Sequence, residues 1–295
     1  CDAHHGICCR AGGLRQRADA KRRFARCAVQ LTLVHSSQHM KAISMIDHVK
    51  ITDSDAIRLI TLNRMDKKNA LTVAMYSAMA DAVNDANANP AIRCILFTGS
   101  DTTFTAGGDL GDFLTAAESG APLMPDTIRF LHSLAHNEKP VVAAVEGYAV
   151  GIGTTMLFHC DVVTAGRAAK FVTPFSSLGL LPEAGSSLLA PQMFGMQRAF
   201  KMLVMGHAMD AIEAKATGLV SDVVNDGEAL ACARERAIEI TRLPPESVRI
   251  ARRLIRGNVN ALVARIDDEA EHFRARLCAP ETLKALREFA SARKS

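Results

Sequence analysis

The sequence has no tryptophan and only two tyrosines among its 295 residues, and aromatic residues make up 5% of it. Such a composition disfavours a surface on which nucleic-acid bases would stack. No run of about 18 or more uninterrupted apolar residues occurs, which excludes a transmembrane helix. The formal net charge is only +4, which is too small to indicate nucleic-acid binding by itself. Hydrophobic residues at 48% and charged residues at 22% are ordinary values for a globular protein.

The sequence also lacks a Cys-x-x-Cys pair, although it contains eight cysteines. The cysteines near His4 and His5 match no common zinc-site spacing, so we expect no bound metal. This cysteine usage favours a reducing, cytoplasmic setting. Beyond the first 27 residues the cysteines are widely separated, and we predict buried structural thiols at Cys94, Cys160, Cys232 and Cys278.

Residues 1–39 differ from the rest because they are rich in arginine and contain only two acids, Asp2 and Asp19. Two interpretations are open: a transit peptide, or an extension ahead of a true start at Met40 or Met45. We favour the second, because Met45 leads directly into a strand pattern. This segment is therefore left out of the fold argument as a non-structural leader.

The body of the chain alternates between short apolar runs and helical patterns, which indicates the α/β class. The apolar runs are continuous rather than alternating, so helices must cover both faces of the sheet. A break at Pro244-Pro245 divides a core at residues 40–243 from a separate helical C-terminal region at residues 244–295. Predicted strands lie at 48–51, 57–62 (after a turn at 53–55), 91–97, 139–145, 161–165 and 170–173. Predicted helices lie at 72–88 (with Thr72 as the N-cap), 126–136 and 151–160, with further helices to the end.

Three glycine-containing segments follow strand-like runs, where α/β proteins bind their ligands: residues 104–110, 146–153 and 178–187. The spacing of the glycines in 146–153 does not match the dinucleotide pattern Gly-x-Gly-x-x-Gly, so we do not predict NAD binding. Such loops present backbone N–H groups at the start of a helix, and two of them together can form an oxyanion hole. For any one loop alone, close packing of helix on sheet is the simpler interpretation.

These three segments in order, with residues 60–64 and 68–71 before them, resemble the crotonase (enoyl-CoA hydratase/isomerase) superfamily. The resemblance covers residues 45 to about 290. It implies a spiral of repeated β-β-α turns with a helical C-terminal region, usually assembled as a homotrimer or a dimer of trimers. It also implies an acyl-CoA thioester as substrate, in fatty acid or related acyl-CoA degradation. Coenzyme A would arrive as part of that substrate, so no separate cofactor is expected, and neither is a nucleic-acid or membrane partner.

The same resemblance implies roles for individual residues. The N–H groups of Gly108 and Ile152 would form the oxyanion hole that holds the thioester oxygen as it becomes an enolate. Lys67 and Lys68 would lie on the nucleotide and pantetheine side and contact phosphate, although a solvated surface explains both lysines equally well. The other residues expected to bind substrate are Ala70, Leu71, Ala106, Gly107, Thr155 and Phe175.

The sequence departs from the family's hydratases at both carboxylates that hold the attacking water. Thr155 stands at the first position, and Phe175 follows Pro174 at the second. Neither side chain can act as a base near neutral pH. Glu183 remains, in a place similar to the single catalytic glutamate of the Δ3,Δ2-enoyl-CoA isomerases. One carboxylate that removes a proton at C2 and returns it at C4 needs no activated water, so we predict an isomerase with Glu183 as its base.

Other interpretations stay open. Glu183 also fits the first turn of the next helix, where acids are favoured. Asp109 is expected to fix its own loop, and Asp112 is a second candidate acid, which would favour a hydratase or another enolate-forming enzyme.

A catalytically silent acyl-CoA-binding subunit and an RNA-binding relative are alternatives of another class. The latter would need a basic face, for which the sequence offers Arg249, Arg252, Arg253 and Arg256, although a solvated helix face or a contact with acyl-CoA phosphates explains them as well. His132 and His136 have no third ligand nearby in sequence and are expected at the surface.

Overall fold

The computed structural model describes residues 42–46, 48–100, 102–119, 125–292. The leader predicted at residues 1–39 lies outside the described residues. Within them, no helix is long and apolar enough to cross a membrane. All of the elements below belong to one compact unit that runs from Met40 to Ser295.

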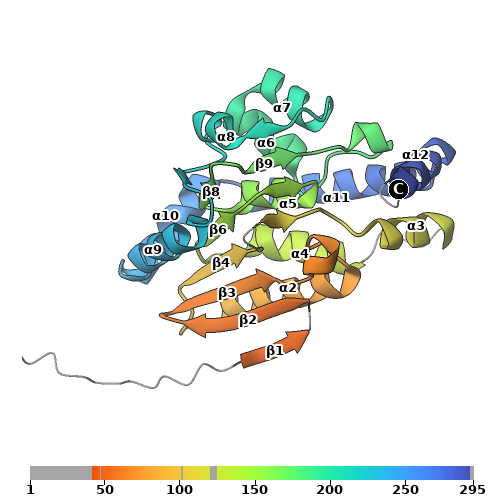
Figure 1. The fold of residues 1–295 in the computed structure, drawn as a ribbon. Helices are drawn as coiled ribbons and strands as arrows, with labels where there is room; N and C mark the ends of the chain where they lie inside the picture. Colours follow the sequence, from red (N-terminus) through yellow and green to blue (C-terminus); the bar gives the residue numbers. More distant parts are fainter. Residues whose placement is uncertain (1–41, 47, 101, 120–124, 293–295) are drawn as a thin grey trace, which may run out of the picture. The chain divides into compact units, whose positions relative to one another are not determined.

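Two sheets form the framework, and Figure 1 shows their strands. The larger sheet contains, in spatial order, β1 (Ala42–Ile46), β2 (Val49–Ser54), β3 (Ile57–Leu62), β4 (Cys94–Thr98), β6 (Val141–Val145), β8 (Val162–Gly166) and β11 (Asp222–Val224). Its first three strands are antiparallel, and all pairs from β3 onward are parallel. The smaller sheet contains β10 (Met209–Asp210), β9 (Lys170–Val172), β7 (Tyr148–Val150) and β5 (Thr103–Thr105).

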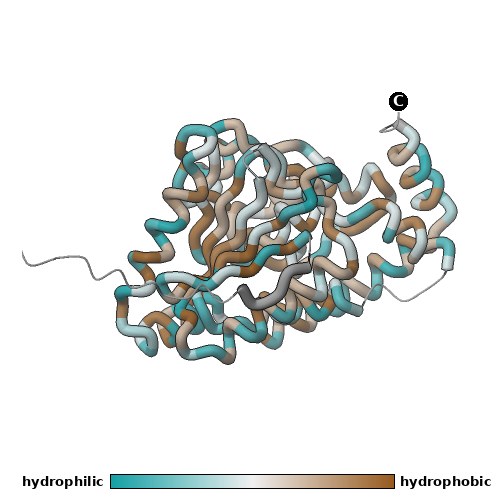
Figure 2. Tube along the Cα trace, turned by 60° about the horizontal axis from the view of Figure 1, so that its bottom comes forward, coloured by the Kyte–Doolittle hydropathy of each residue, from teal (hydrophilic) through white to brown (hydrophobic). Residues whose placement is uncertain are grey.

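Helices cover both faces of the larger sheet, which explains why its strands are continuously apolar. In β4, Ile95 and Phe97 pack toward α2 (Val73–Ala88) and α4 (Pro125–His136), whereas Cys94 and Leu96 pack toward α9 (Ala229–Thr241). In Figure 2 the interior strands are predominantly hydrophobic, whereas hydrophilic segments lie mainly on the outer helices and turns. The α/β class with crotonase-like architecture is thus confirmed.

The remaining helices extend to the end of the described chain, and two of them, α5 and α8, pack against strands of the smaller sheet. The longest of them, α11, packs against α4, α3 and α6, so the helices after Pro244 are not a detached appendage. Their bounds are α3 (Leu110–Ser119), α5 (Ile152–Thr155), α6 (Ser186–Phe194), α7 (Met196–Leu203), α8 (Ala211–Thr217), α10 (Pro245–Arg256), α11 (Val259–Leu277) and α12 (Pro280–Ala292). Short 3-10 turns are η1 (Met65–Lys67), η2 (Met156–His159) and η3 (Ser176–Leu178).

Local predictions are confirmed in part. Thr72 is the N-cap of α2, and its hydroxyl accepts a hydrogen bond from the Met75 N–H at 3.4 Å. The turn predicted at 53–55 was placed too early, because β2 continues to Ser54 and the chain reverses at Asp55 and Ala56, both with positive φ. The strand predicted from residue 91 begins only at Cys94, after a short turn that follows α2.

The prediction of four buried cysteines is correct for Cys94 and wrong for Cys278. Cys278 is exposed because it is the C-cap residue of α11, where the chain leaves the helix at the surface. Cys160 and Cys232 are half-buried.

Candidate active site

A single pocket brings together most of the predicted site. The pocket and its open mouth together enclose about 900 Å³ of empty space. Apolar side chains from four helices form much of its wall: Leu110 and Phe113 of α3, Ile128 and Leu131 of α4, Ile266 and Phe273 of α11, and Phe289 of α12. Six of the residues predicted from the sequence also line it: Ala106, Gly107, Gly108, Ile152, Phe175 and Glu183.

The first loop presents the Gly108 amide to this pocket. The Leu71 N–H donates to the Gly107 carbonyl oxygen at 2.8 Å, and the Leu71 carbonyl oxygen accepts the Asp109 N–H at 2.9 Å. These two hydrogen bonds form a parallel β-bridge between Leu71 and Gly108. Because backbone groups alternate in direction along an extended chain, the Gly108 N–H points away from Leu71. Among the described residues, no protein acceptor takes this N–H.

The second loop presents the Ile152 amide. Gly151 is the N-cap of α5 with φ +54, and its carbonyl accepts the N–H groups of Thr154 at 2.8 Å and Thr155 at 3.0 Å. Ile152 is the first helical residue, where the N–H group has no partner within the helix. No hydrogen bond from the Ile152 N–H to the described part of the chain is present.

The two loops lie against each other because glycine allows close approach. A Cβ atom at Gly107 would lie 2.8 Å from the Val150 carbonyl oxygen, and Gly107 has a positive φ of 87°. A Cβ atom at Gly153 would lie 2.3 Å from Cγ2 of Thr105. The structure therefore has room only for glycine at this contact, and the contact brings the Gly108 and Ile152 amides to one pocket.

Glu183 precedes α6 rather than lying in its first turn, and its half-buried side chain lines the pocket. Thr155, fully buried in α5, donates its hydroxyl hydrogen to Oε1 of Glu183 at 2.7 Å. Burial raises the pKa of Glu183 to about 7, although the Thr155 hydrogen bond lowers it, and the negative charge of Glu269 raises it further. Glu183 is thus able to take up and release a proton near neutral pH.

The other acids near the first loop are held by the protein. Asp109 pairs with Arg64 at 2.5 Å and accepts the N–H groups of Gly111 at 2.8 Å and Asp112 at 3.3 Å. Burial alone would raise the pKa of Asp109, but the Arg64 side chain and these amides lower it overall. The loop-fixing role expected for Asp109 is therefore present. Asp112 accepts the Val73 N–H at 3.0 Å and does not line the pocket.

Four residues expected on the coenzyme A side do not line the pocket. Lys67 and Lys68 are exposed at η1, and Lys68 is the left-handed C-cap of that turn. Leu71 is buried and supports the first loop through its bridge to Gly108, while Ala70 is half-buried beside it.

Two buried residues that hold the backbone next to Glu183 could not be identified from the sequence. His159 of η2 lies 2.7 Å, through Nε2, from the carbonyl oxygen of Ala184. Burial lowers the pKa of His159 to about 4, so the ring is neutral and Nε2–H is the donor. Glu269 of α11 accepts the N–H groups of Gly185 at 2.6 Å and Ser187 at 2.9 Å. Both contacts join segments that are distant in sequence, so no local motif indicates them.

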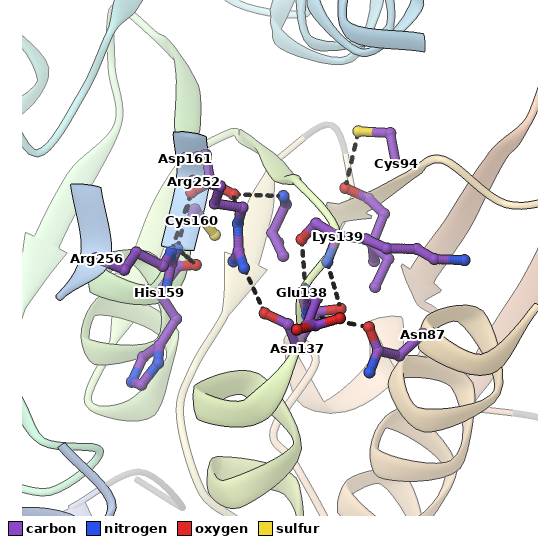
Figure 3. A network of polar contacts seen from close by, with 12 residues as sticks. Asn87, Cys94, Asn137, Glu138, Lys139, His159, Cys160, Asp161, Arg252 and Arg256 are labelled. Carbon is purple, nitrogen blue, oxygen red and sulfur yellow. Dashed lines mark hydrogen bonds and ion pairs between the residues drawn. The ribbon is translucent and has the colours of Figure 1, made fainter. Parts of the chain in front are cut away.

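The arginines proposed as a basic face are mostly used within the chain, as Figure 3 shows for two of them. Arg252 is buried and pairs with Asp161 at 2.7 Å, and Arg256 contacts Asp161 and the His159 carbonyl oxygen. Arg249 pairs with Glu246 at 2.6 Å. The Arg252 and Arg256 contacts attach α10 to the chain that follows η2, so these two side chains are not part of a free surface for RNA.

Comparisons with known proteins identify the family of this chain. The chain matches the enoyl-CoA hydratase/isomerase family over residues 52–295. It is 35% identical over 249 residues to enoyl-CoA delta isomerase 2 of Rattus norvegicus, an alignment that covers 82% of this chain and 63% of that protein. It is 34% identical over 201 residues to a probable enoyl-CoA hydratase of Mycobacterium tuberculosis, covering 68% of this chain and 77% of that protein.

Among solved structures, OdaA of Pseudomonas aeruginosa matches with a TM-score of 0.79 and 41% sequence identity, covering 82% of this chain and 98% of that chain. The chain belongs to the enoyl-CoA hydratase/isomerase family of the crotonase superfamily. It spans less than two thirds of the length of the rat relative, and its relatives carry both isomerase and hydratase names.

Proposed function

We propose that this protein is a Δ3,Δ2-enoyl-CoA isomerase, which moves a double bond through an enolate. One observation carries the proposal: Glu183 is the only carboxylate among the described residues that line the pocket. Gly108 and Ile152, whose amides have no protein acceptor among the described residues, line the same pocket. One base and two amide donors are the groups that this isomerisation needs, and no second carboxylate is required.

In the proposed reaction, the thioester oxygen accepts hydrogen bonds from the Gly108 and Ile152 amides. The Glu183 carboxylate removes a proton from C2 of a 3-enoyl thioester, and the electrons of that C–H bond delocalise onto the thioester oxygen. The resulting dienolate is held by the two amides, each of which contributes about 3–4 kcal/mol in comparable oxyanion holes. The protonated Glu183 then returns the proton to C4, which leaves the 2-enoyl thioester and the original carboxylate.

The surroundings of Glu183 suit this task. A pKa of about 7 leaves about half of the side chains ionised at neutral pH, and makes the carboxylate a stronger base than an exposed one. Thr155 fixes one carboxylate oxygen, which leaves the other free to face C2. Phe175, at the position of the second hydratase carboxylate, lines the pocket with an apolar ring and holds no water for addition to a double bond.

Coenzyme A enters this reaction as part of the substrate, and we propose no separate cofactor. The exposed Lys67 and Lys68 at η1 are available to its phosphates. We further propose that the protein assembles as a homotrimer or a dimer of trimers. Exposed apolar side chains along α7, at Met196, Phe200 and Val204, support this assembly.

Hydration is the second candidate, because a relative of similar identity carries that name. It would require a second acid, and Asp112 is committed to the Val73 N–H outside the pocket. A catalytically silent acyl-CoA-binding subunit is the third candidate function.

Turnover of a 3-enoyl-CoA and of a 2-enoyl-CoA by the wild type and by Glu183→Gln tests the proposal. We expect isomerisation of the 3-enoyl substrate, reduced about 10²–10⁴-fold in the variant. Glu271→Gln, at an exposed position on α11, is the matched control and should retain wild-type turnover. Hydration of the 2-enoyl substrate, or full activity in Glu183→Gln, would overturn the assignment. Binding of both thioesters without turnover would indicate the silent subunit.

A further inference from the structure

A second buried glutamate lies behind the proposed base. Glu269, on the long helix α11, is 7% exposed. Its two carboxylate oxygens accept the N–H groups of Gly185 at 2.6 Å and Ser187 at 2.9 Å. These two amides belong to the beginning of α6, whose N-cap residue is Gly185 and has no side chain to serve as a cap. Glu269 therefore caps α6 from another element, at the end of the helix where negative charge is stabilised.

The turn that Glu269 holds is the turn that carries Glu183. Ala184, between Glu183 and the cap, has a φ of +63°, a left-handed backbone conformation that is unfavourable for a non-glycine residue. The Ala184 carbonyl oxygen is held by Nε2–H of His159 on one side, and the amides that follow are held by Glu269 on the other. A left-handed alanine in this position persists because the contacts on both sides of it fix the backbone.

The two glutamates have different surroundings and therefore different roles. Both carboxyl pKa values are raised by burial, but Glu269 has hydrogen-bond donors from Gly185 and Ser187 that lower its own pKa in compensation. Glu183 has the single hydroxyl of Thr155 and an open side toward the pocket. When two carboxyl groups are close, the one with more donors stays ionised, and the other takes up the proton.

We propose that Glu269 is a positioning residue, which fixes the turn bearing Glu183 through its two amide hydrogen bonds and strengthens Glu183 as a base through its buried negative charge. This inference rests on the proposed function in one respect: the proposed function makes Glu183 the base. The electrostatic coupling between the two carboxyl groups can be tested without any turnover.

The other polar groups around Glu183 do not supply a negative charge equivalent to that of Glu269. Thr155 of α5 is a neutral donor, and Tyr76 of α2 has its pKa raised well above its ordinary value by burial, so that its ring hydroxyl is neutral. His159 of η2 is neutral as well. Asp112 of α3 does not line the pocket, and its carboxylate is hydrogen-bonded to the start of α2. Arg265 of α11 lies on the Glu269 side, where it contacts the Ser187 hydroxyl at 3.2 Å.

The experiment compares Glu269→Gln, Glu269→Asp and Glu271→Gln with the wild type. The carboxyl pKa of Glu183 is measured by NMR titration of ¹³C-labelled glutamate side chains, with Glu183→Gln used to assign its signal. We expect the Glu183 pKa to fall in Glu269→Gln, to stay close to wild type in Glu269→Asp, which keeps the charge, and to be unchanged in Glu271→Gln. In the pH profile of turnover, the acid limb of Glu269→Gln should move to lower pH, and its plateau should fall about three- to tenfold because the base is weaker.

A folded Glu269→Gln variant whose Glu183 pKa equals that of the wild type would overturn the inference. If that variant fails to fold, the reciprocal measurement replaces it, because coupling between two titrating groups is mutual. Glu183→Gln must then lower the pKa of Glu269, and an unchanged value would equally overturn the inference. Failure of the proposed function is a separate result: it appears as absent isomerase turnover in the wild type, while the two pKa values still report on their coupling.

Discussion

At the scale of single residues, the proposed chemistry depends on one contact, the hydrogen bond from the Thr155 hydroxyl to the Glu183 carboxylate. The hydroxyl donates to the ionised form, so it lowers the pKa of Glu183 against the opposing effects of burial and of Glu269. The same hydrogen bond fixes the carboxylate in one rotamer. Position 155, where the hydratases of the family hold a glutamate, therefore serves here to orient a different glutamate.

Thr155→Val keeps the shape of this side chain and removes its donor. Without the donor, the charged form of Glu183 is disfavoured, so its pKa rises above about 7 and the acid limb of the pH profile moves to higher pH. We expect kcat/KM at pH 7 to fall about three- to tenfold and to recover in part at higher pH. Turnover of a 3-enoyl-CoA as a function of pH measures this.

Thr155→Ser retains the hydroxyl and is the matched control, with a profile expected at the position of the wild type. If Thr155→Val and the wild type have the same acid limb, the hydrogen bond does not control ionisation of Glu183.

Some residues of the site could be predicted from the sequence and others could not, for a physical reason. Gly108, Ile152 and Glu183 lie within short segments whose residue types resemble family motifs, and all three line the pocket. Glu269 acts on an amide 84 residues away in the sequence, and its neighbours on α11 resemble any amphipathic helix. A carboxylate that caps a helix belonging to another part of the chain leaves no local pattern.

At the scale of elements, one buried amide attaches the η1 turn to strand β5. Asn69 is fully buried, accepts the Arg64 N–H at 2.8 Å, and donates from Nδ2 to the Phe104 carbonyl oxygen at 3.1 Å. It also has a positive φ of 55°, which asparagine tolerates better than most residues. The first glycine loop, which carries Gly108, follows β5 directly, so Asn69 supports the position of Gly108.

Asn69→Ala removes these hydrogen bonds, leaves buried backbone groups without partners and keeps the left-handed backbone. We expect the free energy of unfolding to fall by about 2–4 kcal/mol, measured by urea denaturation. Asn225→Ala, at an exposed asparagine, should change it by less than about 0.5 kcal/mol. A loss of less than about 1 kcal/mol in Asn69→Ala would show that the loop is held by other contacts.

The elements that could be predicted are those with a strong pattern over several residues. The strands β4 and β6 are buried on both faces and read as nearly continuous apolar runs. The strands β5, β7, β9 and β11 have three residues each and β10 has two, which is too short for any periodicity. Of these five only β9 was predicted. In the structure β10, β9, β7 and β5 are recognised as strands because they pair with one another in the smaller sheet, and β11 because it pairs with β8 in the larger one.

At the scale of the whole molecule, α7 has apolar side chains on two sides. Ala199, Met202 and Leu203 are buried in the core. Met196, Phe200 and Val204 follow each other at intervals of four residues, on one side of the helix, with exposures of 74%, 56% and 39%. Such a stripe on a protein surface is typical of a contact with another protein, and the proposed assembly supplies a second copy of this chain.

Phe200→Glu tests whether this stripe joins copies of the chain. A charge placed in an apolar interface must be desolvated without a partner, which costs several kcal/mol at each contact, so the variant should sediment as smaller species than the wild type. Leu254→Glu, which introduces the same charge at a side chain on α10 that is 74% exposed, should sediment like the wild type. Sedimentation velocity at micromolar concentration distinguishes these species.

A wild type that sediments as a monomer would contradict the proposed assembly, whereas a trimeric Phe200→Glu variant would place the interface elsewhere. Equal turnover by the Phe200→Glu and wild-type proteins would show that the pocket is complete within one chain.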